Sequence, residues 1–379
     1  MSAPERAGVT ARIVRLRPDE LGLLALRVLA LVAVIAGVPH VPNAAAQRFV
    51  EIAHAPGLPW RDGAVEYAIG DWLVIRAVGW GSVGLARALL GLVAFGADLV
   101  AWRAVASGWG RAAATRYLWL GAPLLVFIYR RSDLVAVALA AAGLALASRG
   151  RERAGGVSLA GAVLAKLWPI VVAPALAIER HARALRTAAI ALIAGLAGWL
   201  LLGGVDALRQ VGTFRGATGW ELESTVGVVV WAVTGEHRFE AGANRTGTVP
   251  AGVGPALLAA TLLAVVAIWL LARRRPLTPA GVPALAAVAA LLVFAPVFSP
   301  QYVAWLLPWA AIAGRDGRRW TWLGSVPVIL TGTLVTLWYA DVDLGPGGNQ
   351  LFLAARNLAV MAIVIVYLLR PVRAERTGG

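Results

Sequence analysis

The chain has 379 residues, of which 59% are hydrophobic and only 15% are charged. A soluble globular domain carries about 25% charged residues, so this composition excludes one and is typical of an integral membrane protein. Cysteine is absent, which excludes disulfides, thiolate catalysis and zinc-thiolate or iron-sulfur sites. The formal net charge is +15, and its meaning depends on where the basic residues fall.

Nearly uncharged stretches recur along the chain, and each is a candidate transmembrane helix. They lie at about 21–38, 83–104, 116–129, 134–148, 155–166, 169–179, 187–202, 252–271, 281–296, 301–313, 321–338 and 351–369. The fifth and sixth are short and meet at Lys166, so we expect a broken or re-entrant pair there. We predict an all-α polytopic membrane protein of about 12 (10–12) transmembrane helices, which forms a single integral domain over residues 1–379.

The distribution of charge predicts the topology. With the N-terminus in the cytoplasm, every predicted inner segment carries three or more arginines, which is the positive-inside pattern. Both termini are then cytoplasmic, and long extracytoplasmic loops follow the first and seventh spans, at about 39–82 and 203–251. The basic balance reflects topology, so nucleic acid is not an expected partner. The arginine, alanine and glycine content suggests a bacterial protein of the plasma (inner) membrane, with its active side extracytoplasmic.

Candidate carboxylates for proton transfer lie in the first long loop. Asp62 and Glu66 are four residues apart and can share one face of a helical turn, with Arg61 beside them. Glu51 lies on a segment with helical spacing. The competing interpretation for each is a solvated loop charge.

Lys166 is the only lysine among 35 basic residues, and it lies beside Pro169 where two short helices meet. We expect it to contact a phosphate or a sugar; the alternative is a side chain that snorkels to the interface. Arg131 and Asp133 occupy a very short outer turn and are expected to orient the site as an ion pair, unless they only cap a helix.

Further candidates lie in the second long loop and at the tenth span. Arg215, Trp220, Glu221 and Glu223 combine an aromatic face with charged groups, as sugar binding requires. Gln301 and Tyr302 can donate hydrogen bonds to a sugar, although a tyrosine at a span end also fits an aromatic belt.

Charged residues also fall inside predicted spans, where they are costly. Arg27 and Arg356 are expected to snorkel toward an interface. Asp98 is expected to pair inside the bundle.

Short motifs follow one another in a fixed order along the chain. They are RFVEIA at 48–53, PWRD at 59–62, VEY at 65–67, RSD at 131–133, LAKLWP at 164–169, WELES at 220–224 and FSPQY at 298–302. Together they resemble glycosyltransferase family 87, which comprises GT-C-fold transferases that use polyprenyl-phosphate-mannose.

The resemblance implies a GT-C-like bundle and an inverting glycosyl transfer. The transferred sugar is then a hexose, by the family resemblance mannose, which passes from a polyprenyl-phosphate sugar to a glycolipid or polysaccharide acceptor of the cell envelope. Membrane lipids are the surrounding partners, and neither a divalent metal nor another cofactor is required. With the residue chemistry above, it assigns catalysis to Asp62, Glu66 or Glu51. Donor phosphate and sugar contacts fall to Lys166, Arg131, Asp133, Arg61, Tyr67, Gln301 and Tyr302, and acceptor contacts to Arg215, Trp220, Glu221 and Glu223.

The chain departs from the family pattern at one position. Families of this fold carry an acidic general base just after the first span, and here that position falls on Ala45. The base is therefore expected elsewhere in the loop, or the protein binds the lipid donor or scaffolds other transferases without catalysis. A multi-span transporter or lipid-sugar flippase is the other alternative, although transporters of this size usually repeat six plus six spans with modest outer loops.

Overall fold

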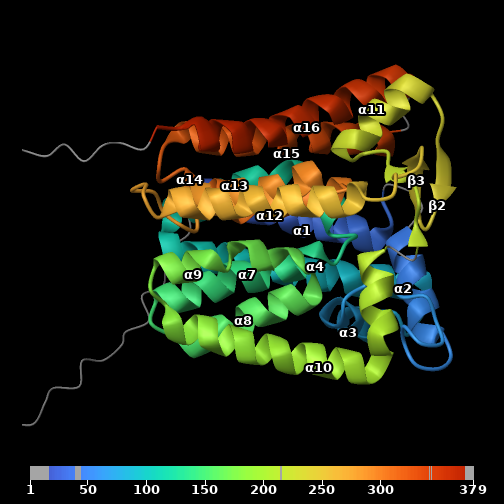
Figure 1. Ribbon diagram of the computed structural model, residues 1–379, viewed down its shortest axis with the longest axis horizontal. Coiled ribbons are helices and arrows are strands. Elements are labelled where there is room, and N and C mark those ends of the chain that lie inside the picture. The colour runs from blue at the N-terminus through green and yellow to red at the C-terminus, as the bar shows by residue number, and fades with distance from the viewer. Residues whose placement is uncertain (1–16, 39–43, 214–215, 341, 343, 372–379) are drawn as a thin grey trace, which may run out of the picture.

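A computed structural model describes residues 17–38, 44–213, 216–340, 342 and 344–371. The chain is mainly helical, and most of its helices lie side by side along one direction (Figure 1). Within the described residues, five helices are long and apolar enough to cross a membrane: α4, α10, α12, α15 and α16. The expectation of a helical membrane protein is confirmed.

The helices of the first half are α1 (Pro18–Ala36), α2 (Ala44–His54), α3 (Ile69–Val78), α4 (Val83–Trp109), α5 (Arg111–Gly121), η1 (Ala122–Leu124), α6 (Leu125–Ile128), α7 (Asp133–Ser148), α8 (Glu152–Ala165), η2 (Trp168–Val172) and α9 (Pro174–Ile178). The second half contains α10 (Ala182–Gly212), β1 (Trp220–Glu221), α11 (Thr225–Thr234), β2 (Arg238–Glu240), β3 (Ala243–Thr246), α12 (Val253–Ala272), α13 (Val282–Phe294), η4 (Pro300–Leu306), α14 (Leu307–Ala313), α15 (Arg318–Tyr339) and α16 (Gly345–Leu369). The elements named η are short 3-10 helices.

Each predicted apolar stretch coincides with a helical segment, but several segments are interrupted. The expected break at Lys166 is present: this residue is extended (φ −144°, ψ 123°), and Pro169 follows in the 3-10 helix η2. Proline cannot donate a backbone hydrogen bond, so α8 does not continue through this point. The helix α14 is likewise preceded by the 3-10 helix η4, in which Pro300 is the first residue.

The two long loops lie at the same end of the bundle, which we call the loop end (Figure 1). The first contains α2 and α3. The second begins later than predicted, because α10 bends at Gly204 (φ 63°, ψ −163°) and then continues to Gly212. Glycine permits this positive φ without a steric penalty. The second loop also contains a three-stranded antiparallel sheet in the order β1-β3-β2, so the expectation of an entirely α-helical chain is wrong for this short segment.

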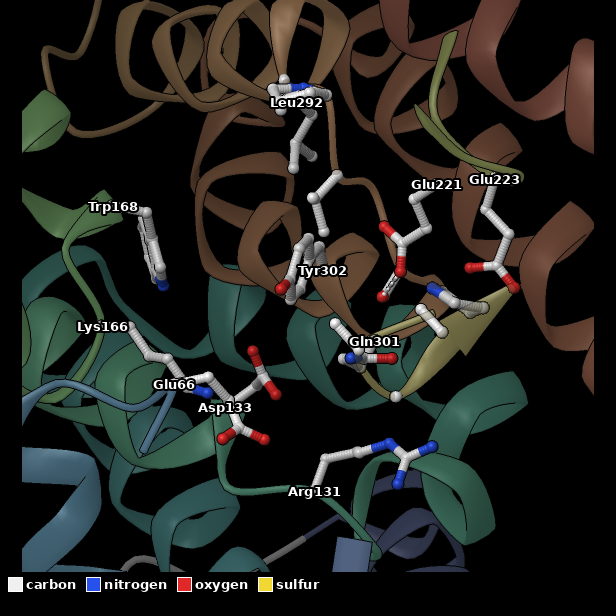
Figure 2. Close-up of a pocket in the computed structure, with 18 of the residues that line it drawn as sticks. Glu66, Arg131, Asp133, Lys166, Trp168, Glu221, Glu223, Leu292, Gln301 and Tyr302 are labelled. Atoms are coloured by element: carbon white, nitrogen blue, oxygen red, sulfur yellow. Dashed lines mark hydrogen bonds between the residues drawn. The ribbon is translucent and has the colours of Figure 1, made fainter. Parts of the chain in front are cut away.

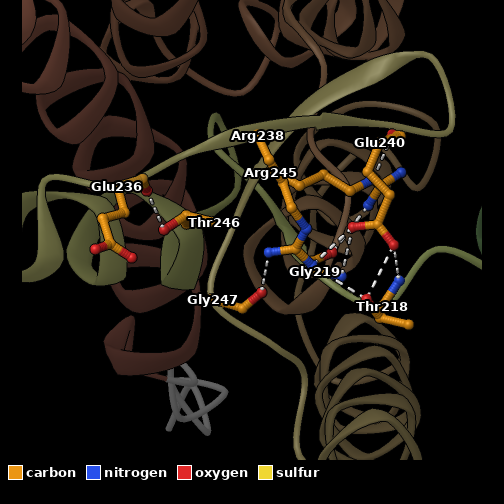
Figure 3. Close-up of polar contacts among 8 residues, drawn as sticks. All are labelled: Thr218, Gly219, Glu236, Arg238, Glu240, Arg245, Thr246 and Gly247. Carbon is orange, nitrogen blue, oxygen red and sulfur yellow. Dashed lines mark hydrogen bonds and ion pairs between the residues drawn. The ribbon is translucent and has the colours of Figure 1, made fainter.

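Polar contacts within the second loop hold its sheet together (Figure 3). The Glu240 carboxylate accepts hydrogen bonds from the backbone N–H of Thr218 at 2.6 Å and from Arg238 Nη2 at 2.9 Å. Arg245 Nη1 donates to the Gly219 carbonyl at 3.0 Å, and Thr246 Oγ1 donates to the Glu236 carbonyl at 2.8 Å. These bonds join the start of the loop to its hairpin, independently of the helix bundle.

A buried polar cluster joins α1 to α4 inside the bundle. Arg27 Nε donates to Asp98 Oδ2 at 2.8 Å, and the hydroxyls of Tyr117 and Tyr129 each donate to the same carboxylate at 2.7 Å. Arg27 is fully buried, so the expectation that it snorkels is wrong, whereas the expectation that Asp98 pairs inside the bundle is confirmed. An unpaired charge at this depth would be costly, so each charge requires the other.

The cluster predicts the effect of neutralising its acid. Asp98→Asn should reduce the free energy of unfolding by about 3–5 kcal/mol, because Arg27 is left buried without a counter-charge. Thermal unfolding of the purified protein in detergent measures the change, with Asp19→Asn at the exposed start of α1 as the control. Equal unfolding midpoints for the two variants would contradict this role.

Candidate active site

A large cavity lies at the loop end, between the two long loops and the ends of the bundle helices. Its volume is about 1860 Å³. Pockets for single drug-sized ligands usually have about 300–1,000 Å³, so this cavity is large enough for two substrates or for one long one. Figure 2 shows charged and aromatic side chains that project into it from several different elements.

The charged centre of the cavity is an ion pair between Asp71 of α3 and Lys166. Lys166 Nζ lies 2.7 Å from Asp71 Oδ2 and 5.2 Å from the centre of the Tyr67 ring. Asp71 is only 1% exposed, and its burial raises the pKa of its carboxyl, against the opposing effect of Lys166. Burial lowers the pKa of Lys166, but the charges of Asp133 and Asp71 outweigh it, so the net shift is upward. Lys166 is therefore a cation held by two acids.

A close approach of two helices brings this ion pair together. Gly70 precedes Asp71 in α3, and a Cβ atom on it would lie 2.7 Å from the backbone nitrogen of Ala165 at the end of α8. Real Cβ atoms essentially never come so close, so only glycine lets α3 reach the end of α8. Because α8 stops at Ala165, Lys166 is the first residue beyond this contact.

An aromatic wall stands beside the ion pair. The rings of Trp168 and Trp305 stack with centroids 5.2 Å apart, and those of Tyr302 and Trp305 stack at 4.1 Å. Trp305 Nε1 donates to Asp133 Oδ1 at 2.9 Å, so Asp133 also orients the wall. Trp168 Nε1 is buried and has no acceptor within the described residues. Flat rings with an unused donor are suited to the face and hydroxyls of a sugar.

The first long loop contributes an arginine-carboxylate group at the cavity edge. Arg48 donates to both carboxylate oxygens of Glu66, from Nε at 3.1 Å and from Nη2 at 2.9 Å. Its Nη1 also donates to Glu51 at 3.3 Å. Glu66 and Glu51 both line the cavity, but Arg48 engages both of them.

Two carboxylates, one buried (Glu221) and one partly buried (Glu223), enter the cavity from the second long loop. Glu221 accepts a hydrogen bond from the Ser299 hydroxyl, and the Glu223 backbone carbonyl accepts bonds from Arg356 and Asn357. Burial, and then the neighbouring charge of Glu221, raises the pKa of Glu223 to about 8. Figure 2 shows the Glu223 side chain turned toward the cavity, on the same side as Glu221.

Arg356 lies on the bundle side of these carboxylates, in α16. It is 1% exposed, and its guanidinium lies 4.0 Å from the centre of the Phe298 ring. The expectation that Arg356 snorkels is wrong, because its guanidinium is used to hold the backbone at Glu223.

The predicted site residues divide into two groups. Those that line the cavity are Glu51, Glu66, Tyr67, Arg131, Asp133, Lys166, Glu221, Glu223, Gln301 and Tyr302. Asp62, Arg61 and Trp220 are absent from its lining. Asp62 accepts the Leu58 backbone N–H at 2.7 Å within a turn, and Arg61 donates to the Leu201 carbonyl at 3.2 Å. Arg215 lies outside the described residues.

Asp71 is the most important of the site residues that sequence reasoning missed; Arg48, Trp168 and Trp305 are others. Asp71 precedes the apolar stretch 72–78, so it resembles the polar start of an interfacial helix. The signal was available: a single carboxylate next to an apolar helix in an outer loop needs a cation when that helix is buried. Lys166, the only lysine in the chain, supplies the charge.

The described residues contain no cluster of three or more histidine, aspartate or glutamate side chains arranged to hold a metal ion. No protein-family model matches the chain, and no curated protein matches it in sequence. The chemistry of the cavity is therefore argued from its own residues.

The contact at Gly70 predicts a matched pair of glycine variants. Gly70→Ala should destabilise the protein by about 1–3 kcal/mol, because the new methyl group overpacks against α8 and separates Asp71 from Lys166. Gly198→Ala in α10 has open space around its Cβ and should be neutral or stabilising by up to about 1 kcal/mol through helix propensity. Thermal unfolding of both variants measures the difference, and equal destabilisation would contradict the argument.

Proposed function

We propose that this protein is a polyprenyl-phosphate-sugar-dependent glycosyltransferase of the GT-C type. In this proposal about twelve spans embed it in the plasma (inner) membrane with the loop end extracytoplasmic, and it transfers a hexose, by the family resemblance mannose, to a lipid or polysaccharide of the cell envelope. The observation that carries the proposal is a single cavity that combines a buried polar centre with an apolar opening toward the membrane-facing surface.

The apolar opening lies between η2 and α12. Three apolar residues line the cavity and are also at least half exposed. They are Ile170 of η2 (50% exposed) and Leu258 and Leu262 of α12 (60% and 57%). Deeper in the bundle, Trp269 Nε1 of α12 donates to the Val171 carbonyl at 2.9 Å and joins the two elements. An isoprenoid chain in the bilayer can lie against this apolar surface while its head group enters the polar part of the cavity.

The polar centre is suited to a sugar. Hydroxyl groups can donate to Asp71 and Asp133 and accept from Lys166, and a pyranose face can pack on the aromatic wall of Trp168, Trp305 and Tyr302. Two acids neutralise the charge of Lys166. Lys166, Asp71 and Asp133 together therefore offer directional hydrogen bonds without a large net charge.

Glu223 is the carboxylate best suited to act as the general base. Asp71 is occupied by Lys166, and Glu66 is occupied by Arg48. Glu223 has no ion pair within the described residues, and its pKa of about 8 makes it a stronger proton acceptor than an ordinary carboxylate. The sequence-based interpretation placed Glu223 among the acceptor contacts, which is where a base must lie.

The proposed reaction is a single displacement. The acceptor hydroxyl oxygen forms a bond to the anomeric carbon as its proton passes to the Glu223 carboxylate. The bond between the anomeric carbon and the phosphate oxygen breaks, and polyprenyl phosphate leaves with the electron pair. One displacement inverts the configuration at the anomeric carbon.

A second candidate, a protein that binds the lipid donor without transfer, is favoured by one observation. Ala45 lines the cavity at the position where relatives of the GT-C type would carry their acid, and a methyl group there cannot accept a proton.

A turnover assay separates the two candidates. Purified protein in nanodiscs is given radiolabelled polyprenyl-phosphate-mannose, with membrane lipids and glycans extracted from the source organism as acceptors. Transfer of label into a new product is the expected result. Donor binding with neither transfer nor hydrolysis, across several sugar donors, would overturn the transferase proposal and favour a donor-binding protein, a transporter or a flippase.

The pKa of Glu223 predicts the pH dependence of turnover. The base works only when ionised, so kcat/KM should rise as pH increases and level off above an apparent pKa of about 8. Glu223→Gln should reduce kcat by roughly a hundredfold to ten-thousandfold and remove this dependence. Glu236→Gln, an exposed glutamate of the same loop outside the cavity lining, is the control. An unchanged pH profile in Glu223→Gln would assign the proton to another group.

A further inference from the structure

Three arginines that are distant from Lys166 in the sequence line another part of the same cavity. Arg87 lies near the start of α4, while Arg130 and Arg131 form the turn between α6 and α7. All three line the cavity. We call them the arginine cluster.

The acids nearest to Arg87 and Arg131 in the sequence, Asp98 and Asp133, are engaged with other groups. Asp98, which lies on the same helix as Arg87, is taken by Arg27. Asp133, two residues after Arg131, accepts from Trp305 and adds its charge to Lys166. Glu223 lies within range of the Arg131 charge, which lowers the pKa of that carboxyl against the larger effect of burial. Within the described residues, neither Arg87 nor Arg131 forms an ion pair, so the expectation that Arg131 pairs with Asp133 is wrong.

The guanidinium groups are held by nearby contacts, and those of Arg87 and Arg131 are not saturated within the described residues. Arg87 Nη2 donates to the Ile35 carbonyl at 3.2 Å, and Arg130 Nη2 donates to the Val38 carbonyl at 3.0 Å, so both are anchored at the end of α1. The Arg131 guanidinium lies 5.2 Å from the centre of the Phe127 ring. The Nε atoms of Arg87 and Arg131 are buried without an acceptor within the described residues.

The three cations repel one another. Burial lowers the pKa of Arg130, and the charges of Arg87 and Arg131 lower it further. An anion bound among them would relieve this repulsion and would accept hydrogen bonds from the unused N–H groups of Arg87 and Arg131. Guanidinium groups are well matched to phosphate oxygens, which they bind with two parallel hydrogen bonds.

The contrast with Lys166 locates the anion. Lys166 has Asp71 at 2.7 Å and the charge of Asp133 nearby, so the net charge around it does not attract a phosphate. The arginine cluster carries positive charge in the same cavity as the aromatic wall.

We propose that Arg87, Arg130 and Arg131 form the phosphate-binding site of the cavity, and that Lys166 contacts sugar hydroxyls instead. This inference rests on the proposed function and specifies which part of the cavity receives the charged group of a lipid substrate. The phosphate can belong to the polyprenyl-phosphate donor or to an anionic acceptor lipid, because both present the same group at the membrane surface.

Binding measured without turnover tests the proposal. The protein is placed in phosphatidylcholine nanodiscs, and its affinity is measured for radiolabelled polyprenyl phosphate and, separately, for phosphatidylglycerol. Uncharged polyprenol of the same chain length is the reference ligand. Arg87→Gln and Arg131→Gln are compared with Arg103→Gln, which removes the same charge from the other end of α4, outside this cavity.

We expect Arg87→Gln and Arg131→Gln each to weaken phosphate-lipid binding by about ten- to a hundredfold, with polyprenol binding unchanged. Arg103→Gln should stay within about twofold of the unmodified protein. Lysine at either position should restore part of the affinity, because it keeps the charge but loses the two-pronged hydrogen bond. The lipid whose affinity responds identifies the source of the phosphate.

Other outcomes would overturn the proposal. Unchanged phosphate-lipid binding in both glutamine variants would do so, as would a larger loss in Lys166→Gln. Equal weakening for polyprenol and polyprenyl phosphate, with a lowered unfolding midpoint, would show that the arginines only cap α1. Because no sugar transfer is measured, a failure of the glycosyltransferase proposal leaves this result interpretable.

Discussion

The pairing of charge inside an apolar bundle is the constraint on which the rest of this structure depends. In hydrocarbon, a buried ion without a partner is costly, so the bundle neutralises its own charges. Arg27 and Asp98, with two tyrosine hydroxyls, form such a closed group. At the loop end this closure is incomplete: Lys166 has an ion pair with Asp71 and the charge of Asp133 nearby, whereas neither Arg87 nor Arg131 forms an ion pair within the described residues. The chemistry proposed for the cavity follows from that imbalance.

Breaks in the helices place the functional groups. A continuous helix satisfies its own backbone and presents side chains only to its sides. Here α8 ends at Ala165, and 3-10 helices replace α-helix at η2 and η4. Lys166 therefore projects from the break after α8, and Tyr302 projects from the first turn of η4. Hydrophobicity and proline spacing were enough to predict the apolar segments and the break at Lys166. They did not predict that α10 continues beyond Gly204, because a pair of glycines in an apolar stretch does not distinguish a bend from an end.

The sequence predicted a site residue only where the neighbouring residues in the chain restrict the direction in which its side chain can point. Lys166, Arg131 and Asp133 lie on short connections between apolar helices, and the structure brings them to one cavity. Asp62 and Glu66 looked equivalent in sequence, yet Asp62 closes a turn with Leu58 while Glu66 lines the cavity. Which way a loop carboxylate points depends on contacts with distant residues. Asp71 is the clearest case, since its burial follows from the approach of α3 to α8 at Gly70, and the local sequence does not show which distant helix α3 contacts.

The hairpin of β2 and β3 is fastened by hydrogen bonds within its own loop, and residues 241–244 at its tip line the cavity without donating any of these side-chain bonds. Phe239, on the same hairpin, is 76% exposed and also lines the cavity. Substitutions at the hairpin tip therefore leave the fastening bonds and the helix bundle intact while they reshape the entrance. In evolutionary terms, ligand preference can diverge at this loop by small changes, whereas the position of the charged centre depends on the packing of the helices.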